Sequence, residues 1–161
     1  MGPFARRRGG LRMRLGEGEA ELLGRVVHEL RGEVESPERS PHLRRLFPPA
    51  YPDDDESQRE FARLTGDDLV AQKRAALDDV ERALQRGHVR RGVWSTDLSH
   101  DEVSSMLGFL NDARLTLGTR LDVTEDMAET SIDPHDPDAP AHVAYRYLGW
   151  LQSFLVDELL A

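Results

Sequence analysis

The hydrophobic pattern divides most of the chain into amphipathic helices. Valines and leucines recur every three or four residues over 17–34, which predicts a helix that opens with acidic residues. The same spacing predicts helices over about 67–86, 100–117 and 139–160, with Gly87 and Gly118 as C-terminal stops. Residues 65–68 and 99–102 have the form of capping boxes. Two shorter helices, one after Ser40 and one over about 56–66, bring the expected total to five or six.

The first 15 residues follow a different pattern, that of a β-hairpin. Residues 11–15 alternate between apolar and charged side chains, the period of a strand, and Gly9-Gly10 before them is a turn signal. A turn at this pair would place Phe4 opposite Leu15 and Arg7 opposite Arg12. Two opposed arginines repel one another unless an acid or a phosphate lies between them. The hairpin is therefore either an edge ribbon kept soluble by charge or a docking strip for an acidic partner; its arginines are Arg6, Arg7, Arg8, Arg12 and Arg14.

Together these elements predict one mainly α-helical domain over 1–161, a compact bundle of five to six helices with a small N-terminal antiparallel β-hairpin at 1–15. Residues 90–98 are interpreted as an extended segment or loop, and the acidic, proline-rich 130–140 as a surface loop. Trp150 falls beside the apolar stripe of the last helix, which indicates either packing at the core edge or a homodimer face. That helix is expected to bury Val143, Tyr147, Leu148, Leu151, Phe154, Leu155 and Leu159.

Charge is distributed unevenly along the chain. The net charge is −9, but residues 1–14 contain five arginines and no acid, which leaves −14 on the remainder. Because the acidic remainder would repel phosphate, direct and specific DNA binding is disfavoured. Contact with DNA is therefore expected only through the N-terminal arm or through a partner, and the main contact is expected to be a protein.

The composition excludes several classes of protein. The chain has no cysteine, which removes disulfides, thiolate metal sites and cysteine nucleophiles, and which fits a cytoplasmic protein. No secretory signal is recognisable at the N-terminus. No apolar run approaches the roughly 20 residues that cross a bilayer, so no contact with a membrane is expected.

No catalytic or metal-binding motif stands out. A glycine-rich phosphate loop, a His-Glu-x-x-His pair and a Gly-x-Ser-x-Gly elbow are all missing, and the six histidines are scattered singly. The acidic run at 53–56 and His135 among its aspartates lack the ligand spacing of known metal sites. We therefore expect no catalytic residue, no metal and no cofactor; an active site assembled from distant residues is the alternative.

A group of polar residues interrupts the most apolar helix. Asn111, Asp112 and Arg114 lie within the stretch over 100–117, and Arg120 follows it. Buried polar groups have to be paired, so this polar cluster is either an internal hydrogen-bond network or a contact with a partner or ligand.

Three stretches in order resemble a known family. They are the arginine-rich hairpin before an acid-opened helix, RLFPPAYPDD at 45–54, and LNDARLTLGTRL at 110–121. Together they resemble an actinobacterial domain-of-unknown-function family encoded beside the ClpS protease adaptor, the AosR-like group of oxidative-stress regulators. The resemblance covers essentially the whole chain, and the last stretch is its most specific part.

The resemblance implies a cytoplasmic transcriptional regulator of the oxidative-stress type, which acts at promoters through a protein such as a sigma factor or RNA polymerase. It implies no known catalytic activity. A cysteine redox switch is ruled out in this chain, because it has no cysteine. The alternative, suggested by gene neighbourhood, is an adaptor or scaffold in Clp-dependent protein turnover. Homodimerisation is expected under either hypothesis.

Overall fold

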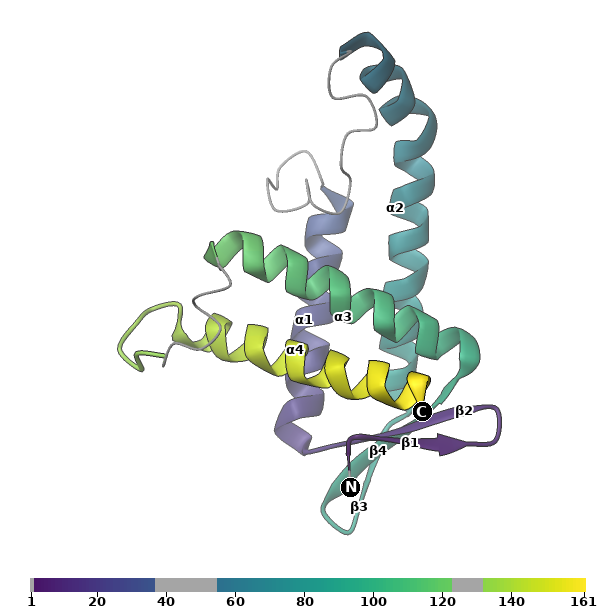
Figure 1. The fold of residues 1–161 in the computed structure, drawn as a ribbon, viewed down its shortest axis with the longest axis vertical. Helices are drawn as coiled ribbons and strands as arrows, with labels where there is room; N and C mark the ends of the chain where they lie inside the picture. Colours follow the sequence, from purple (N-terminus) through teal and green to yellow (C-terminus); the bar gives the residue numbers. More distant parts are fainter. Residues whose placement is uncertain (1, 37–54, 123–131) are drawn as a thin grey trace.

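The computed structural model describes residues 2–36, 55–122 and 132–161, which form four strands and four helices (Figure 1). In chain order these are β1 (Phe4–Arg7), β2 (Gly10–Leu15), α1 (Glu17–Glu35), α2 (Asp55–Arg86), β3 (His88–Arg90), β4 (Val93–Ser99), α3 (His100–Leu121) and α4 (Ala139–Leu160). The short helix expected after Ser40 lies outside the described residues. The mainly α-helical class is confirmed, but the described residues contain four helices instead of five to six.

The four strands form one antiparallel sheet in the order β1-β2-β4-β3. The N-terminal hairpin is thus only half of the sheet, and the segment expected to be an extended stretch or loop supplies the other half. The central pairing joins β2 to β4, with Met13 opposite Thr96 and Leu15 opposite Trp94. Segments about 80 residues apart in the sequence therefore lie side by side.

The register of the first hairpin differs from the prediction. Phe4 pairs with Met13, and Arg7 pairs with Gly10 instead of Arg12. The turn consists of Arg8 and Gly9, and Gly9 adopts a left-handed φ of 85°. Gly10 belongs to β2 and approaches β4 closely, because a Cβ atom there would lie 1.8 Å from the carbonyl oxygen of Leu98. The expected register is wrong because this contact requires Gly10 in the strand.

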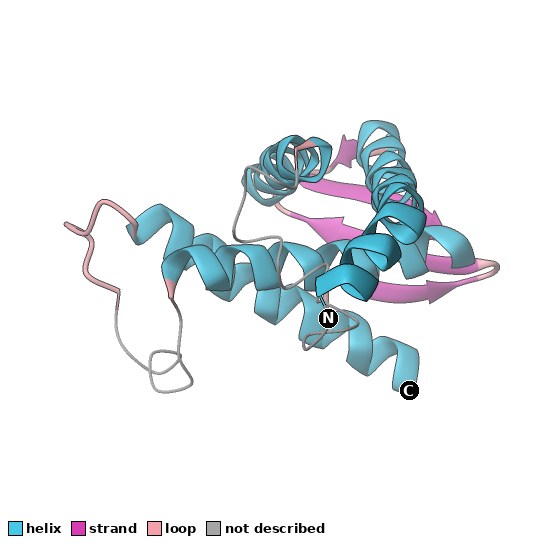
Figure 2. Cartoon of the chain, turned by 90° about the horizontal axis from the view of Figure 1, so that it is seen from above, coloured by secondary structure: helices cyan, strands magenta, loops and turns pink. Residues whose placement is uncertain are grey.

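The helices lie on one side of the sheet, and the core is between the two layers (Figure 1). In Figure 2 the view is from the helical side, with the strands behind the helices. Alternation along the strands directs Leu11, Met13, Leu15, Trp94 and Leu98 into this core. Helix α3 packs between α2 and α4, and its buried Phe109 and Leu110 fill the centre. No described helix has both the length and the apolar character needed to cross a bilayer.

Two helix boundaries follow the predicted signals. Helix α2 ends at Arg86, directly before Gly87. Helix α3 begins after Ser99, whose side chain accepts a hydrogen bond from the Glu102 amide while the Glu102 carboxylate accepts one from the Ser99 amide. The capping box predicted at 99–102 is confirmed.

Two other predicted boundaries are wrong, and both involve glycine. Helix α2 continues through Gly66 without a break, which merges two expected helices into one. A glycine inside a helix weakens it by about 1 kcal/mol, which packing elsewhere can offset. Helix α3 passes through Gly118 and ends at Leu121. A Cβ atom at Gly118 would lie 3.2 Å from the Tyr145 ring, so this glycine lets α4 approach α3.

The burial expected along α4 is confirmed for only part of its stripe. Leu148, Leu151 and Leu155 are fully buried, but Val143 and Phe154 are exposed. Leu159 is also exposed, close to the C-terminal end of the helix. The buried stripe runs through Ala144, and a second apolar stripe, one residue further round the helix, is directed outward.

Candidate interaction surface

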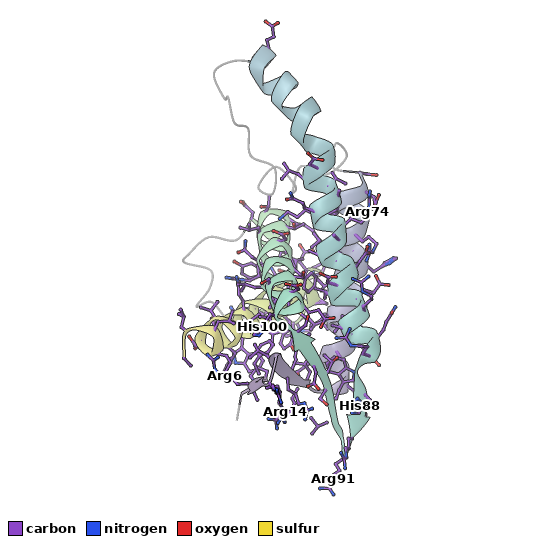
Figure 3. The ribbon with its side chains drawn as sticks, turned by 90° about the vertical axis from the view of Figure 1, so that its right-hand side faces the viewer. Arg6, Arg14, Arg74, His88, Arg91 and His100 are labelled. Carbon is purple, nitrogen blue, oxygen red and sulfur yellow. The ribbon has the colours of Figure 1, made fainter. Side chains whose placement is uncertain are left out.

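The outer side of the sheet, away from the helices, is a basic surface. Residues that pair across antiparallel strands share a face, so Arg12 lies beside Ala5 and Asp97, and both Arg14 and His88 lie beside Ser95. Arg14 and Arg91 are directed away from the helices in Figure 3. We call this surface the basic face; with the turn residues Arg8 and Arg91, it comprises Ala5, Arg7, Gly10, Arg12, Arg14, His88, Arg90, Val93, Ser95, Asp97 and Ser99.

Charge is separated between the two layers of the fold. Residues 4–15 and 88–99, which form the strands and turns of the sheet, contain seven arginines and a single acid, Asp97. Their formal charge is +6, so the rest of the chain carries −15. A charge imbalance of this kind produces a local positive potential that attracts acidic groups, even though the whole protein is acidic.

The single acid of the sheet pairs with the arginine at the centre of the basic face. The Arg12 guanidinium donates to both Asp97 carboxylate oxygens, at 2.7 Å and 3.0 Å. The Arg12 hydrogen bond holds the pKa of Asp97 below its usual range, and the same contact raises the pKa of Arg12. An acid therefore does lie beside Arg12, but it comes from β4, which the sequence pattern did not identify as a strand.

One arginine of the predicted docking strip has a different role. Arg6 pairs with Leu11, which places it on the inner side of the sheet, at its edge. Its guanidinium donates to the carbonyl oxygens of Glu158 and Ala161, both at 2.7 Å, and lies 3.5 Å from the Glu158 carboxylate (Figure 3). A cation at the C-terminal end of a helix satisfies its last carbonyls and complements its dipole. Arg6 therefore connects β1 to the C-terminal end of α4 and does not belong to the basic face.

A cleft adjoins the basic face where β2 ends and β4 begins. Arg14 and Val93 belong to both surfaces, and Trp150 and Phe154 of α4 form the opposite wall. These two rings are 4.8 Å apart between centroids, and their side chains remain 45% and 37% exposed. The sequence pattern placed Trp150 beside the buried stripe of its helix, but it gave no sign that Gly2 and Pro3, before β1, complete a cleft there.

The predicted polar cluster is not a cluster in space. Asn111 is exposed, and Asp112 is buried with its carboxylate 2.7 Å from the Lys73 ammonium of α2. Arg114 extends the opposite way, donates to Gln152 of α4 at 2.6 Å and lies over the Tyr145 ring. These contacts connect α3 to its two neighbouring helices, which favours a structural role for Asp112 and Arg114.

Arg120 is separate from the other three predicted cluster residues. It is exposed and lines a small hollow between α1 and α3, together with Glu29 and Glu33. Within the described residues, no three acidic or histidine side chains are grouped so that they could hold a metal ion. Among the described residues, the basic face and its adjoining cleft combine unequal charge with exposed aromatic rings, so we take them as the candidate interaction surface.

Comparison with known proteins identifies one family. Neither the curated proteins nor the solved structures gave a match. A family profile described as "Domain of unknown function (DUF2017)" matches residues 1–159, nearly the full length of the chain. The protein therefore belongs to the DUF2017 family of domains of unknown function.

Proposed function

We propose that this protein regulates transcription by binding a protein partner through the basic face. The observation that carries the proposal is the separation of charge, +6 on the sheet against −15 elsewhere. Because the remainder of the chain is acidic, an acidic partner would be attracted mainly to the sheet, so the charge pattern would orient the encounter. The resemblance to oxidative-stress regulators supports a sigma factor or RNA polymerase as the partner, and such a role places the protein in the cytoplasm.

A protein partner is favoured over nucleic acid by the composition of the basic face. Open sheets that bind single-stranded nucleic acid stack bases on exposed aromatic rings. The outer positions of this sheet carry arginines, small residues, Val93, one histidine and one aspartate. The exposed rings of Trp150 and Phe154 lie on α4 beside the sheet, and no aromatic ring lies on its outer strand positions. The Asp97 carboxylate near the centre would also oppose a phosphate chain, whereas a protein surface can place a donor beside it.

A pull-down from the native host tests the proposal. The tagged wild-type chain is compared with a variant in which exposed Arg7, Arg90 and Arg91 are changed to alanine, with and without peroxide. A control variant loses the same charge from the helices, at Arg25, Arg82 and Arg120, which are also exposed. We expect the wild type and the control to capture a sigma factor or RNA polymerase, and the basic-face variant to capture at least tenfold less.

Three results would contradict the proposal. Equal capture by both variants would remove the basic face from the interaction. Capture of Clp components in place of transcription proteins would favour an adaptor in protein turnover. Tight binding of promoter DNA by the purified chain, with a steep dependence on salt, would favour direct DNA recognition.

A further inference from the structure

The cleft beside the basic face is lined mainly by apolar and small residues. Its volume is about 510 Å³, within the range of sites that accept a side chain or a small ligand. It lies between the N-terminal segment, the end of β2, the start of β4 and the middle of α4. Its lining residues are Gly2, Pro3, Arg14, Leu15, Gly16, Glu19, Gly92, Val93, Trp150 and Phe154.

The aromatic wall of this cleft leaves a large apolar surface exposed to solvent. Trp150 stacks at a tilt between Tyr147 and Phe154, with centroid distances of 5.8 Å and 4.8 Å. Val93, on the other side of the cleft, is 44% exposed. Large apolar side chains gathered at the surface mark interaction sites, and buried aromatic anchors supply much of the binding energy at protein interfaces.

The charged residues around the cleft are predominantly basic. Arg14 lies in its wall, and Arg90 and Arg91 directly precede Gly92 at its rim. The acid in its lining, Glu19, accepts a hydrogen bond from the Gly16 amide at 2.7 Å and so serves to cap α1. A bound peptide that runs from the cleft onto the sheet would therefore contact the apolar lining at one end and arginines at the other.

We propose that the cleft anchors one apolar side chain of an acidic peptide segment whose carboxylates lie on the basic face. The inference rests on the proposed function, because it specifies the part of the protein partner that binds there. Charge complementarity and the shared residues Arg14 and Val93 make the cleft and the basic face one continuous surface. The lining of the cleft is mainly apolar, and Arg14 is the one basic side chain among its described residues, which suits an apolar side chain better than a phosphate group.

Selection from a displayed library of random 12-residue peptides tests this pairing and does not require the partner to be identified first. We expect peptides enriched on the wild-type chain to contain an aromatic residue or leucine flanked by acids. One such synthetic peptide should bind Trp150→Ala at least tenfold more weakly than wild type. It should bind Val143→Ala normally, because Val143 is exposed on the same helix but does not line the cleft. Because Trp150 is 45% exposed and contacts the rings of Tyr147 and Phe154, Trp150→Ala should lower the unfolding midpoint. Binding is therefore measured well below that midpoint, where circular dichroism shows both variants to be folded.

Tryptophan fluorescence adds a direct readout of occupancy. The chain has two tryptophans, and Trp94 is buried in the core, so a change in emission on peptide binding should be absent from Trp150→Phe. Changing the apolar residue of the peptide to alanine should abolish the emission change and weaken binding at least fivefold.

The outcomes separate the two proposals. Acidic peptides that require Arg7, Arg90 and Arg91 but bind Trp150→Ala like the wild type would overturn the cleft proposal and leave the proposed function intact. Enriched peptides without acids, unaffected by the arginine changes, would overturn both. A wild-type dimer that Trp150→Ala converts to a monomer in light scattering would show that a second copy occupies the cleft, which also overturns the cleft proposal.

Discussion

The two layers of this protein use arginine in different ways. In the helical layer, arginines meet acids on neighbouring helices: Arg31 of α1 pairs with Asp78 and Glu81 of α2, and Arg74 of α2 pairs with Glu35 of α1. The sheet contains seven arginines and one acid, Asp97, and Arg6 also pairs with Glu158 of α4. Charge in the helices therefore connects elements of the fold, whereas the sheet carries a formal excess of positive charge. An excess of this kind is what a surface needs if it is to attract a partner.

Glycines of the two layers also differ in how closely the neighbouring chain approaches them, and their substitution gives the largest expected effect on stability. Gly10→Ala would place a Cβ atom 1.8 Å from the Leu98 carbonyl oxygen, which forces β2 and β4 apart. We expect a loss of about 3 kcal/mol in the free energy of unfolding, measured by urea denaturation. Gly32→Ala, at an exposed position of α1, has nothing within 4 Å of its new Cβ and should raise the free energy of unfolding by about 0.5–1 kcal/mol. Similar effects of the two changes would contradict the close contact between the central strands.

The paired acids of the two layers provide the next comparison. Asp112→Ala would leave the half-buried Lys73 ammonium without its carboxylate, and we expect a loss of about 2 kcal/mol by urea denaturation. Asp97→Ala removes a carboxylate that is 61% exposed, so the loss should stay below about 1 kcal/mol. The second change also makes the sheet more positive, so it should strengthen binding of an acidic peptide at low salt. Equal destabilisation by the two variants would contradict the difference between the layers.

The sequence correctly predicted those helices whose start and spacing depend on residues close together in the chain. The capping box at Ser99 and the apolar period of 17–34 depend on residues within one or two turns, and both α3 and α1 begin where these signals place them. The second hairpin has no comparable signal. All of β3 is exposed, and the turn between β3 and β4 places Arg91 at a φ of 53°, a conformation that arginine seldom adopts.

The candidate surface was predictable only in part, for a related reason. The sequence pattern identified Arg7, Arg12 and Arg14 as a strip, but Arg90 and Arg91 join them only through the pairing of β2 with β4. Arg6 belongs to the same run of sequence, yet its partners on α4 lie more than 150 residues away. Periodicity within one segment cannot show which side of a hairpin the helices will cover or where the last helix ends.

The smallest expected effect concerns Glu102, which links the two layers. Its carboxylate accepts two hydrogen bonds from Arg86 at 2.8 Å, and Arg86 also donates to the Asp97 carbonyl oxygen of β4. The Arg86 hydrogen bond, opposed by partial burial and supported by Ser99, holds the pKa of Glu102 below its ordinary value of 4.5. The folded state thus favours the ionised carboxylate, so its stabilisation is present above pH 4.5 and is lost as pH falls through the lower folded pKa.

Glu102→Gln should therefore reduce the loss of folding stability that accompanies a fall in pH. Urea denaturation at pH 5, 4 and 3 should show that the wild type loses about 0.5–1 kcal/mol more than Glu102→Gln over this range. Asp97→Asn, which removes the other acid with a lowered pKa near the junction, should change the slope less, because its side chain is 61% exposed against 17% for Glu102. If instead Asp97→Asn changed the pH dependence of stability more, the Arg12–Asp97 pair of the sheet would stabilise the fold more than the Arg86–Glu102 pair. That result would contradict the view that charge in the helices holds the fold together while charge on the sheet is available to a partner.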